Sequence, residues 1–357
     1  MTEAAANGVL GSILPGQLGV TLMHEHLLFD FRANHEEPLE ATRRALAAAP
    51  VQVGNLAQLY QDPFVSLDNC VQWDSRVAAE EVAEFKRAGG HTVVDLTSAQ
   101  NGRDPLALQE IARDSGLNII MGTGHYIARF HPPEMDSRTQ DSLTSEIIRE
   151  ITSGVGDTGV RAGMIGEVGT SSPITPNEEK SVRAAAAAQA TTGAPLNIHL
   201  VGWARDGLRV LDWIREEGGD VERTILSHMN PSHDDFGYQS AVAERGAYVE
   251  YDMLGMDYLY PPERQCPSDH ECIRGIQRMV AAGYAERLLL SQDVFLKIML
   301  TRHGGYGYAH VLRNIVPVLR KVGVTDVQIQ TMLVGNPRRL LPFAPHTNAT
   351  SIRDAGT

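Results

Sequence analysis

The sequence has little cysteine, no long apolar run and no cluster of basic residues. Only three cysteines occur in 357 residues, Cys70, Cys266 and Cys272, and their spacing matches no zinc-binding motif. An odd, scattered set of cysteines supplies no disulfide framework, so we expect free thiols. No stretch of about eighteen apolar residues is present, which excludes a transmembrane helix.

The charge balance excludes a further class of protein. Lysine and arginine number 31 against 44 aspartate and glutamate residues, which gives a formal net charge of −13. Proteins that bind a phosphate backbone carry a clustered basic footprint, so we expect no nucleic-acid partner and predict a small-molecule substrate. The first residues include Glu3 and lack the apolar core of a secretory signal, which favours a cytoplasmic protein.

What the sequence does contain is one pattern that occurs eight times. Short apolar, β-branched runs alternate with amphipathic stretches rich in Ala, Glu and Arg. The runs predict strands at Val20–Met23, His91–Thr97, Asn118–Gly122, Ala162–Glu167, Pro195–Leu200, Thr224–His228, Ala247–Asp252 and Arg287–Ser291. The stretches between them predict helices at Asp74–Ala88, Pro105–Ser115, Ser142–Thr152, Asn177–Thr192, Ala204–Glu217, Ser240–Arg245 and Cys272–Ala282.

Eight alternations of strand and helix favour a closed barrel. Parallel strands joined by right-handed helical crossovers have both faces of their sheet covered, and eight of them can close on themselves. We therefore predict an α/β fold, a (β/α)8 TIM barrel that forms a single domain over residues 1–357. An open, doubly wound sheet is the alternative. The long stretch Leu39–Leu67 is expected to pass over the barrel mouth.

Side chains with metal-ligand chemistry fall at or just after the carboxyl ends of five predicted strands. His24 and His26 are two positions apart, which directs both imidazoles into the barrel. The other candidates are Glu167, His199, His228 and Asp293. Each of them taken alone can also be explained as a buried, hydrogen-bonded core group, and for His199 or His228 alone this explanation is favoured. Because the carboxyl ends of barrel strands meet at the active-site face, the six together predict a metal centre.

These segments resemble the phosphotriesterase family of the amidohydrolase superfamily, and the resemblance covers nearly the whole chain. The matching text is Gly19-Val-Thr-Leu-Met-His-Glu-His26, Ile165-Gly-Glu-Val-Gly-Thr-Ser171, Ile198-His199, Leu226-Ser-His228 and Ser291-Gln-Asp293. The resemblance implies two divalent cations, one on His24, His26 and Asp293 and one on His199 and His228, with a carboxylate that bridges both. It also implies a homodimer.

The bridging position departs from the pattern of many family members. They carry a carboxylated lysine there, whereas this chain has Glu167, as in the homologue branch of the family. A glutamate bridge needs no carbon dioxide to assemble the site. Because of this difference, the resemblance does not imply the organophosphate hydrolysis for which the family is best known.

The expected chemistry is hydrolysis. Two divalent cations lower the pKa of a shared water and polarise the bond to be cleaved. We expect a hydroxide that bridges the cations to attack a lactone or ester carbonyl, with Asp293 as the general base. Phosphotriester or N-acyl amide hydrolysis is the alternative, and a non-catalytic, metal-containing barrel that binds a ligand is an alternative of another class. Zn is the first expectation for the metal, and Mn, Co and Fe also suit such ligands.

Two residues are candidates for binding the substrate. Tyr126 follows the third strand, where some lactonases of the family carry a tyrosine, and packing explains it equally well. Arg302 lies after the eighth strand, before a glycine-rich segment, and is expected to face a polar or anionic substrate, with a solvated arginine as the alternative. Tyr258 and Tyr260 lie in the long connection after the seventh strand and are expected in the pocket wall.

Overall fold

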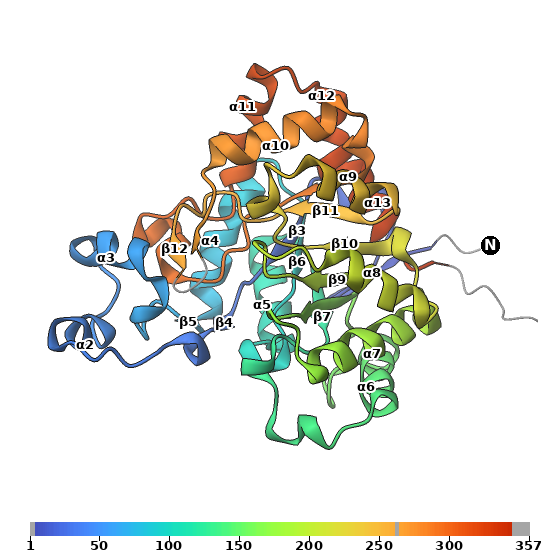
Figure 1. The fold of residues 1–357 in the computed structure, drawn as a ribbon, viewed down its shortest axis with the longest axis horizontal. Coiled ribbons are helices and arrows are strands. Elements are labelled where there is room, and N and C mark those ends of the chain that lie inside the picture. The colour runs from blue at the N-terminus through green and yellow to red at the C-terminus, as the bar shows by residue number, and fades with distance from the viewer. Residues whose placement is uncertain (1–3, 261–263, 345–357) are drawn as a thin grey trace, which may run out of the picture.

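The computed structural model describes residues 4–260 and 264–344, and its centre is a sheet of eight parallel strands (Figure 1). They run in the order β14-β11-β10-β9-β8-β7-β6-β3 across the sheet. All eight predicted strands are confirmed, with ends that shift by one or two residues. Their bounds are β3 (Thr21–Glu25), β6 (Thr92–Asp95), β7 (Asn118–Thr123), β8 (Met164–Gly169), β9 (Leu196–His199), β10 (Thr224–Leu226), β11 (Tyr248–Tyr251) and β14 (Leu288–Leu290).

The two outer strands of this order, β3 and β14, lie next to each other. The Ser291 hydroxyl donates to the carbonyl oxygen of His24 at 2.8 Å, and the backbone N–H of Asp293 donates to the same oxygen at 3.2 Å. The sheet is therefore nearly closed into a ring, which confirms the predicted TIM barrel and excludes the open sheet.

Helices cover the outside of the ring at all seven predicted places. They are α4 (Ser75–Arg87), α5 (Pro105–Ser115), α6 (Gln140–Thr152), α7 (Pro176–Thr192), α8 (Gly207–Glu216), α9 (Phe236–Glu244) and α10 (Asp269–Ala281), followed by α11 (Val316–Lys321), α12 (Asp326–Gln330) and α13 (Asn336–Leu340). Helix α9 begins four residues before the predicted Ser240, because the Asp235 carboxylate accepts from the backbone N–H of Tyr238 and caps the helix there.

The amino end of the barrel is covered by a hairpin that sequence analysis missed. It consists of β1 (Ala6–Gly8) and β2 (Gly11–Ile13), followed by the short helix α1 (Pro15–Leu18). Its apolar side chains pack in one cluster with residues of the barrel interior such as Met164. The hairpin comes so close to Gly163 that a Cβ there would lie 2.2 Å from a backbone oxygen of the hairpin. These short runs carry too few apolar residues to be recognised from periodicity.

The carboxyl end is covered by the excursion, residues 39–67, together with two small antiparallel sheets. The excursion contains α2 (Ala41–Ala47) and α3 (Leu56–Gln61), which project at the left of Figure 1. The small sheets are β4 (Phe29–Asp30) with β5 (Val71–Gln72), and β12 (Leu259–Tyr260) with β13 (Arg264–Gln265). No helix within the described ranges has the length and apolar character needed to cross a membrane.

A buried ion pair ties the end of β7 to the helices around it. The guanidinium of Arg103 makes two hydrogen bonds to the Glu150 carboxylate, at 2.7 and 3.0 Å, and one to the Gly122 carbonyl oxygen at 3.0 Å. The side chains of Arg103 and Glu150 are only 4% and 8% exposed. The pair therefore fixes the strand end that leads into Tyr126.

We expect Arg103→Ala to lower the free energy of unfolding by about 3–5 kcal/mol, because Glu150 would remain buried without a counter-charge. The measurement is denaturant unfolding followed by circular dichroism. Arg113→Ala serves as a control, since this exposed arginine contacts Gln109 and should change stability by less than about 0.5 kcal/mol. Equal losses in the two variants would contradict the role given to the buried pair.

Candidate metal centre

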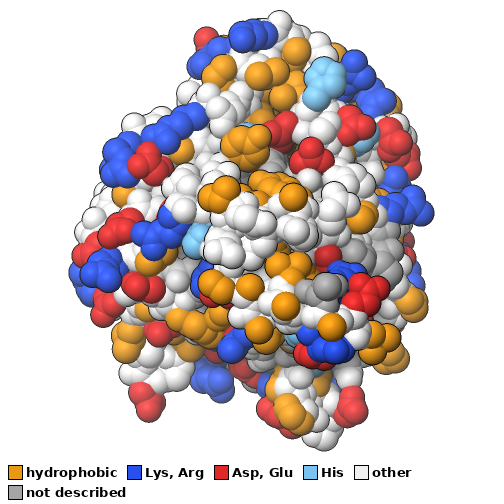
Figure 2. Space-filling view, turned by 90° about the vertical axis from the view of Figure 1, so that its left-hand side faces the viewer, with side chains coloured by type: hydrophobic (Ala, Val, Ile, Leu, Met, Phe, Trp, Pro, Cys, Tyr) orange, Lys and Arg blue, Asp and Glu red, His pale blue; other side chains and the backbone are white. Residues whose placement is uncertain are grey.

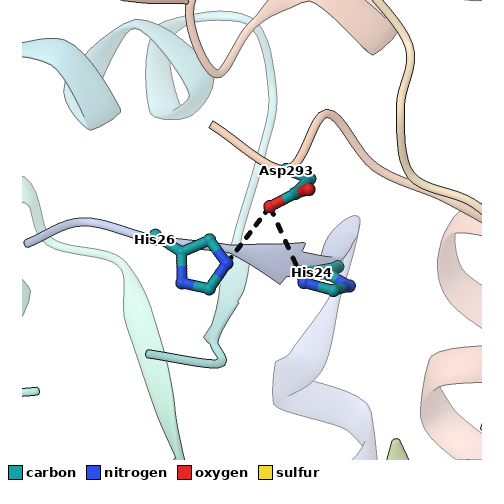
Figure 3. Close-up of side chains that lie close together, drawn as sticks. All are labelled: His24, His26 and Asp293. Atoms are coloured by element: carbon teal, nitrogen blue, oxygen red, sulfur yellow. Dashed lines mark ion pairs between the residues drawn. The ribbon is translucent and has the colours of Figure 1, made fainter. Parts of the chain in front are cut away.

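The first group of candidate ligands comes from the two strands that close the barrel. His24 lies in β3, His26 follows this strand directly, and Asp293 follows β14, so that the three side chains converge (Figure 3). The Asp293 Oδ1 atom lies 3.1 Å from His26 Nε2 and 3.7 Å from His24 Nε2, as Figure 3 shows. Both Asp293 Oδ1 and His24 Nε2 are buried without a hydrogen-bond partner among the described residues. Two converging buried atoms that lack partners fit a bound cation.

Glu25, between the two histidines, holds the segment that carries Asp293. Its side chain is fully buried and points away from the imidazoles, as the alternation along a strand requires. Its carboxylate accepts from the backbone N–H groups of Gln292 and Val294, both at 2.9 Å, and its Oε1 atom lies 2.7 Å from the hydroxyl oxygen of Ser291. The position of Asp293, after the last barrel strand, therefore depends on Glu25 of the first barrel strand.

The second group lies beside the first, at the ends of three neighbouring strands. Glu167 Oε2 is 3.0 Å from His199 Nδ1 and 3.5 Å from His228 Nε2, and the two imidazole nitrogens are 2.7 Å apart. The other oxygen, Glu167 Oε1, lies 3.4 Å from His26 Nε2. Glu167 thus contacts both groups, as a bridging carboxylate must. The structure brings all six sequence-predicted ligands to one place.

A seventh residue, Asp252, orients one histidine from each group, and sequence analysis did not include it among the ligands or their partners. Its carboxylate lies 3.0 Å from His24 Nδ1 and 3.2 Å from His228 Nδ1. It also accepts from the backbone N–H of His228, which has a positive φ of 58°. These contacts leave the Nε2 atoms of both histidines facing the centre. The signal was available, because Asp252 ends the seventh predicted strand.

The electrostatics of the centre favour positive charge. Burial lowers the pKa of His26 and His228, but nearby carboxylates reverse the effect and raise these pKa values to about 9 and about 10. Burial raises the pKa of Glu167, yet His24, His199 and His228 hold it well below its ordinary value. The carboxylates therefore demand compensating cations, and a metal ion that displaces these protons supplies the same charge.

A cavity of about 630 Å³ opens above the centre. Its floor includes His26, Glu167, His199, His228 and Asp293. One wall is aromatic and is formed by Phe31, Phe64, Tyr126, Tyr260 and Phe295. A concave site that combines an aromatic wall with polar groups at its floor suits a small organic substrate.

The weaker sequence candidates divide into two groups. Tyr126 and Tyr260 line the cavity, and the Tyr126 ring meets the His199 ring edge-on at a centroid distance of 4.8 Å. Tyr258 is buried against Tyr60 and lies outside the cavity lining.

Arg302 does not line the cavity, contrary to the expectation that it faces the site. Its guanidinium donates to Glu80 at 2.9 Å, and its backbone N–H donates to Glu81 at 3.0 Å, both on α4. Glu81 also accepts from the backbone and hydroxyl of Thr301. Residues 301 and 302 are therefore bound to the buried carboxylate of Glu81 on α4, and Arg302 lies outside the cavity lining.

An eight-stranded parallel barrel that gathers four histidines and three carboxylates at its carboxyl end has the active-site layout of a barrel enzyme. The chain belongs to the phosphotriesterase family, whose model matches residues 4–341. It is 37% identical to an N-acetyltaurine hydrolase of Salmo salar, over 94% of this chain and 97% of that protein.

Solved structures agree with this assignment. A resiniferatoxin-binding protein from Rhodobacter sphaeroides is 45% identical and superposes with a TM-score of 0.93, covering 95% of each chain. An organophosphorus hydrolase from Deinococcus radiodurans is 28% identical with a TM-score of 0.76, covering 95% of this chain and 97% of that one. The protein is therefore a hydrolase of the phosphotriesterase family.

We expect Asp252→Ala to weaken metal binding about 10- to 100-fold, because His24 and His228 lose the acceptor that orients them. The measurement is a metal-competition titration of the folded variant against a chelator of known affinity. Asp257→Ala removes an exposed carboxylate from the same connection, where it accepts from Gln265, and should leave the affinity unchanged. Undiminished affinity in Asp252→Ala would show that the contact does not support the site.

Proposed function

We propose that the protein hydrolyses a carboxylic acyl bond with two divalent cations, one held by His24, His26 and Asp293 and one by His199 and His228, with Glu167 as the bridge. The observation that carries the proposal is the convergence of two ligand groups, each with donor atoms within 4.8 Å of one another, at the floor of one cavity. Imidazole and carboxylate donors suit Zn first, and also Mn, Co or Fe.

When bound, such a pair of cations activates a water molecule and polarises the scissile carbonyl. The chain supplies the proton transfer. Asp293 directs Oδ1 at His24 and His26, while its Oδ2 lies 3.8 Å from His228 Nδ1. We propose that the Asp293 carboxylate accepts a proton from the attacking water and then donates this proton to the leaving group.

Among acyl bonds, the comparisons favour an amide over the lactone or ester that sequence analysis placed first. N-acetyltaurine hydrolases of Salmo salar and Danio rerio are 37% and 35% identical to this chain over 97% of their lengths. An amine leaves only after it gains a proton, so a carboxylate that can return a proton is more important for an amide than for an activated ester. Ester, lactone and phosphotriester hydrolysis remain the chemical alternatives.

Tyr126 is the proposed substrate-binding residue that lies in the cavity. Its ring packs edge-on against His199, so the side chain borders the floor where the acyl group would be bound. Arg302 remains only a sequence prediction, because its contacts lie on α4.

The test is hydrolysis of N-acetyltaurine, a γ-lactone, 4-nitrophenyl acetate and paraoxon by the metal-loaded protein. We expect the amide to give the highest kcat/KM. Turnover of paraoxon alone would overturn the acyl assignment. Full metal content without turnover of any of the four compounds would favour the non-catalytic barrel.

We expect Glu167→Ala and the isosteric Glu167→Gln to lose at least one metal per chain and at least about 100-fold in kcat/KM, because neither side chain can bridge two cations. Metal content is measured by elemental analysis of freshly purified protein, and circular dichroism confirms folding. Retention of two metals per chain in both variants would refute the bridge.

A further inference from the structure

One basic side chain faces the cavity. Arg129 is the single lysine or arginine among the described residues that line it. The side chain is 48% exposed, and its guanidinium donates to Glu36 Oε1 at 3.3 Å. This glutamate is itself 81% exposed. An exposed pair with one long contact is weak, so a ligand can displace Glu36 at little cost.

The turn that carries Arg129 is held rigidly. It is the 3-10 turn Ala128–Phe130, which begins two residues after Tyr126. The backbone N–H of Ala128 donates to Glu178 at 2.8 Å, and the buried Phe130 ring lies 5.2 Å from the Tyr126 ring. Because both neighbours are anchored, Arg129 stays at the cavity beside the proposed substrate-binding tyrosine. The planar guanidinium of this arginine is a forked donor that suits a carboxylate or sulfonate.

Few acidic groups outside the candidate ligands compete for this guanidinium. Apart from the candidate ligands, the acids in the lining are Glu36 and Asp62. Asp62 is already paired with Arg43 of the excursion. Figure 2, which looks onto the face that carries the excursion, shows acidic and basic side chains interspersed without a large basic patch. Recognition of an anion by this cavity would therefore depend on one local guanidinium rather than on a general basic surface.

We propose that Arg129 binds an anionic group of the substrate, a carboxylate or sulfonate carried by the leaving amine, and that this group displaces Glu36. The substrate class is then an N-acyl derivative of a small amino acid or aminosulfonate, with its acyl group over the candidate metal centre. This inference rests on the proposed acyl hydrolysis. It further specifies that the leaving group is anionic and that Arg129 binds it.

The test compares substrates that differ in charge at similar length. N-acetyltaurine and N-acetyl-β-alanine are anionic, and N-acetylethanolamine is neutral. We expect Arg129→Gln to raise KM for both anions about 10- to 100-fold, with little change in kcat and no change for the neutral amide. Arg129→Lys should be intermediate, because it retains the charge and loses the fork. Glu36→Gln should lower KM for the anions, since it removes the competing carboxylate.

The matched control is Arg313→Gln. This side chain is 47% exposed and is paired with Glu84, outside the cavity lining, so its KM values should match those of the parent protein. A loss in Arg129→Gln that is equal for anionic and neutral amides would overturn the inference, because it would indicate a structural effect. Unchanged KM values would overturn it as well, while the hydrolase assignment would stand.

A binding measurement separates the failure of this inference from the failure of the proposed function. Nuclear magnetic resonance titration of the metal-loaded protein with N-methylsulfonyl-β-alanine and with N-methylsulfonylethanolamine, two analogues that resist hydrolysis, requires no turnover. Preferential binding of the anion that is lost in Arg129→Gln supports the site even if no amide is hydrolysed. Equal affinity for the two compounds in the parent protein would refute anion recognition, whatever the catalytic result.

Discussion

The site depends on the closure of the barrel. His24 and Ser291 are 267 positions apart, yet the serine hydroxyl donates to the histidine carbonyl oxygen. Glu25 then accepts hydrogen bonds from the backbone N–H groups of Gln292 and Val294 and fixes the path that leads to Asp293. A sheet that remained open would separate the two histidines of β3 from this aspartate. Ring closure therefore belongs to the assembly of the candidate metal centre as much as to the fold.

Closure also concentrates negative charge where water is excluded. Glu167, Glu250, Asp252 and Asp293 are all buried around the same histidines. Burying a charge without a partner is strongly unfavourable, so these carboxylates need either protonated histidines or metal ions. Metal binding should consequently stabilise the folded chain, because the unfolded chain offers no assembled site. Without metal, the histidines of this centre therefore have to take up protons to balance the buried carboxylates.

The features predicted correctly from the sequence are those set by local periodicity and by the rule that barrel strands end at one face. This rule predicted that the six candidate ligands meet at one face, and the structure brings them together there, because each lies close to the carboxyl end of a strand. The same rule would have found Asp252, which was missed because only the residues of the family pattern were carried over. The amino-terminal hairpin was missed for a physical reason, since strands of three residues carry too little periodicity. The start of α9 depends on the single cap Asp235, which no apolar pattern marks.

The two arginines show why the residues that face the cavity were harder to predict than the convergence of the candidate ligands. Both Arg302 and Arg129 follow barrel strands and could face the mouth, but their acidic neighbours differ. Glu81, next to Arg302, is 4% exposed and must find donors within the protein, so it captures the backbone and side chain of that segment. Glu36, next to Arg129, is solvated and makes no such demand. The burial of the partner carboxylate decides which guanidinium is structural and which remains available to a ligand, and burial is a property of the folded chain.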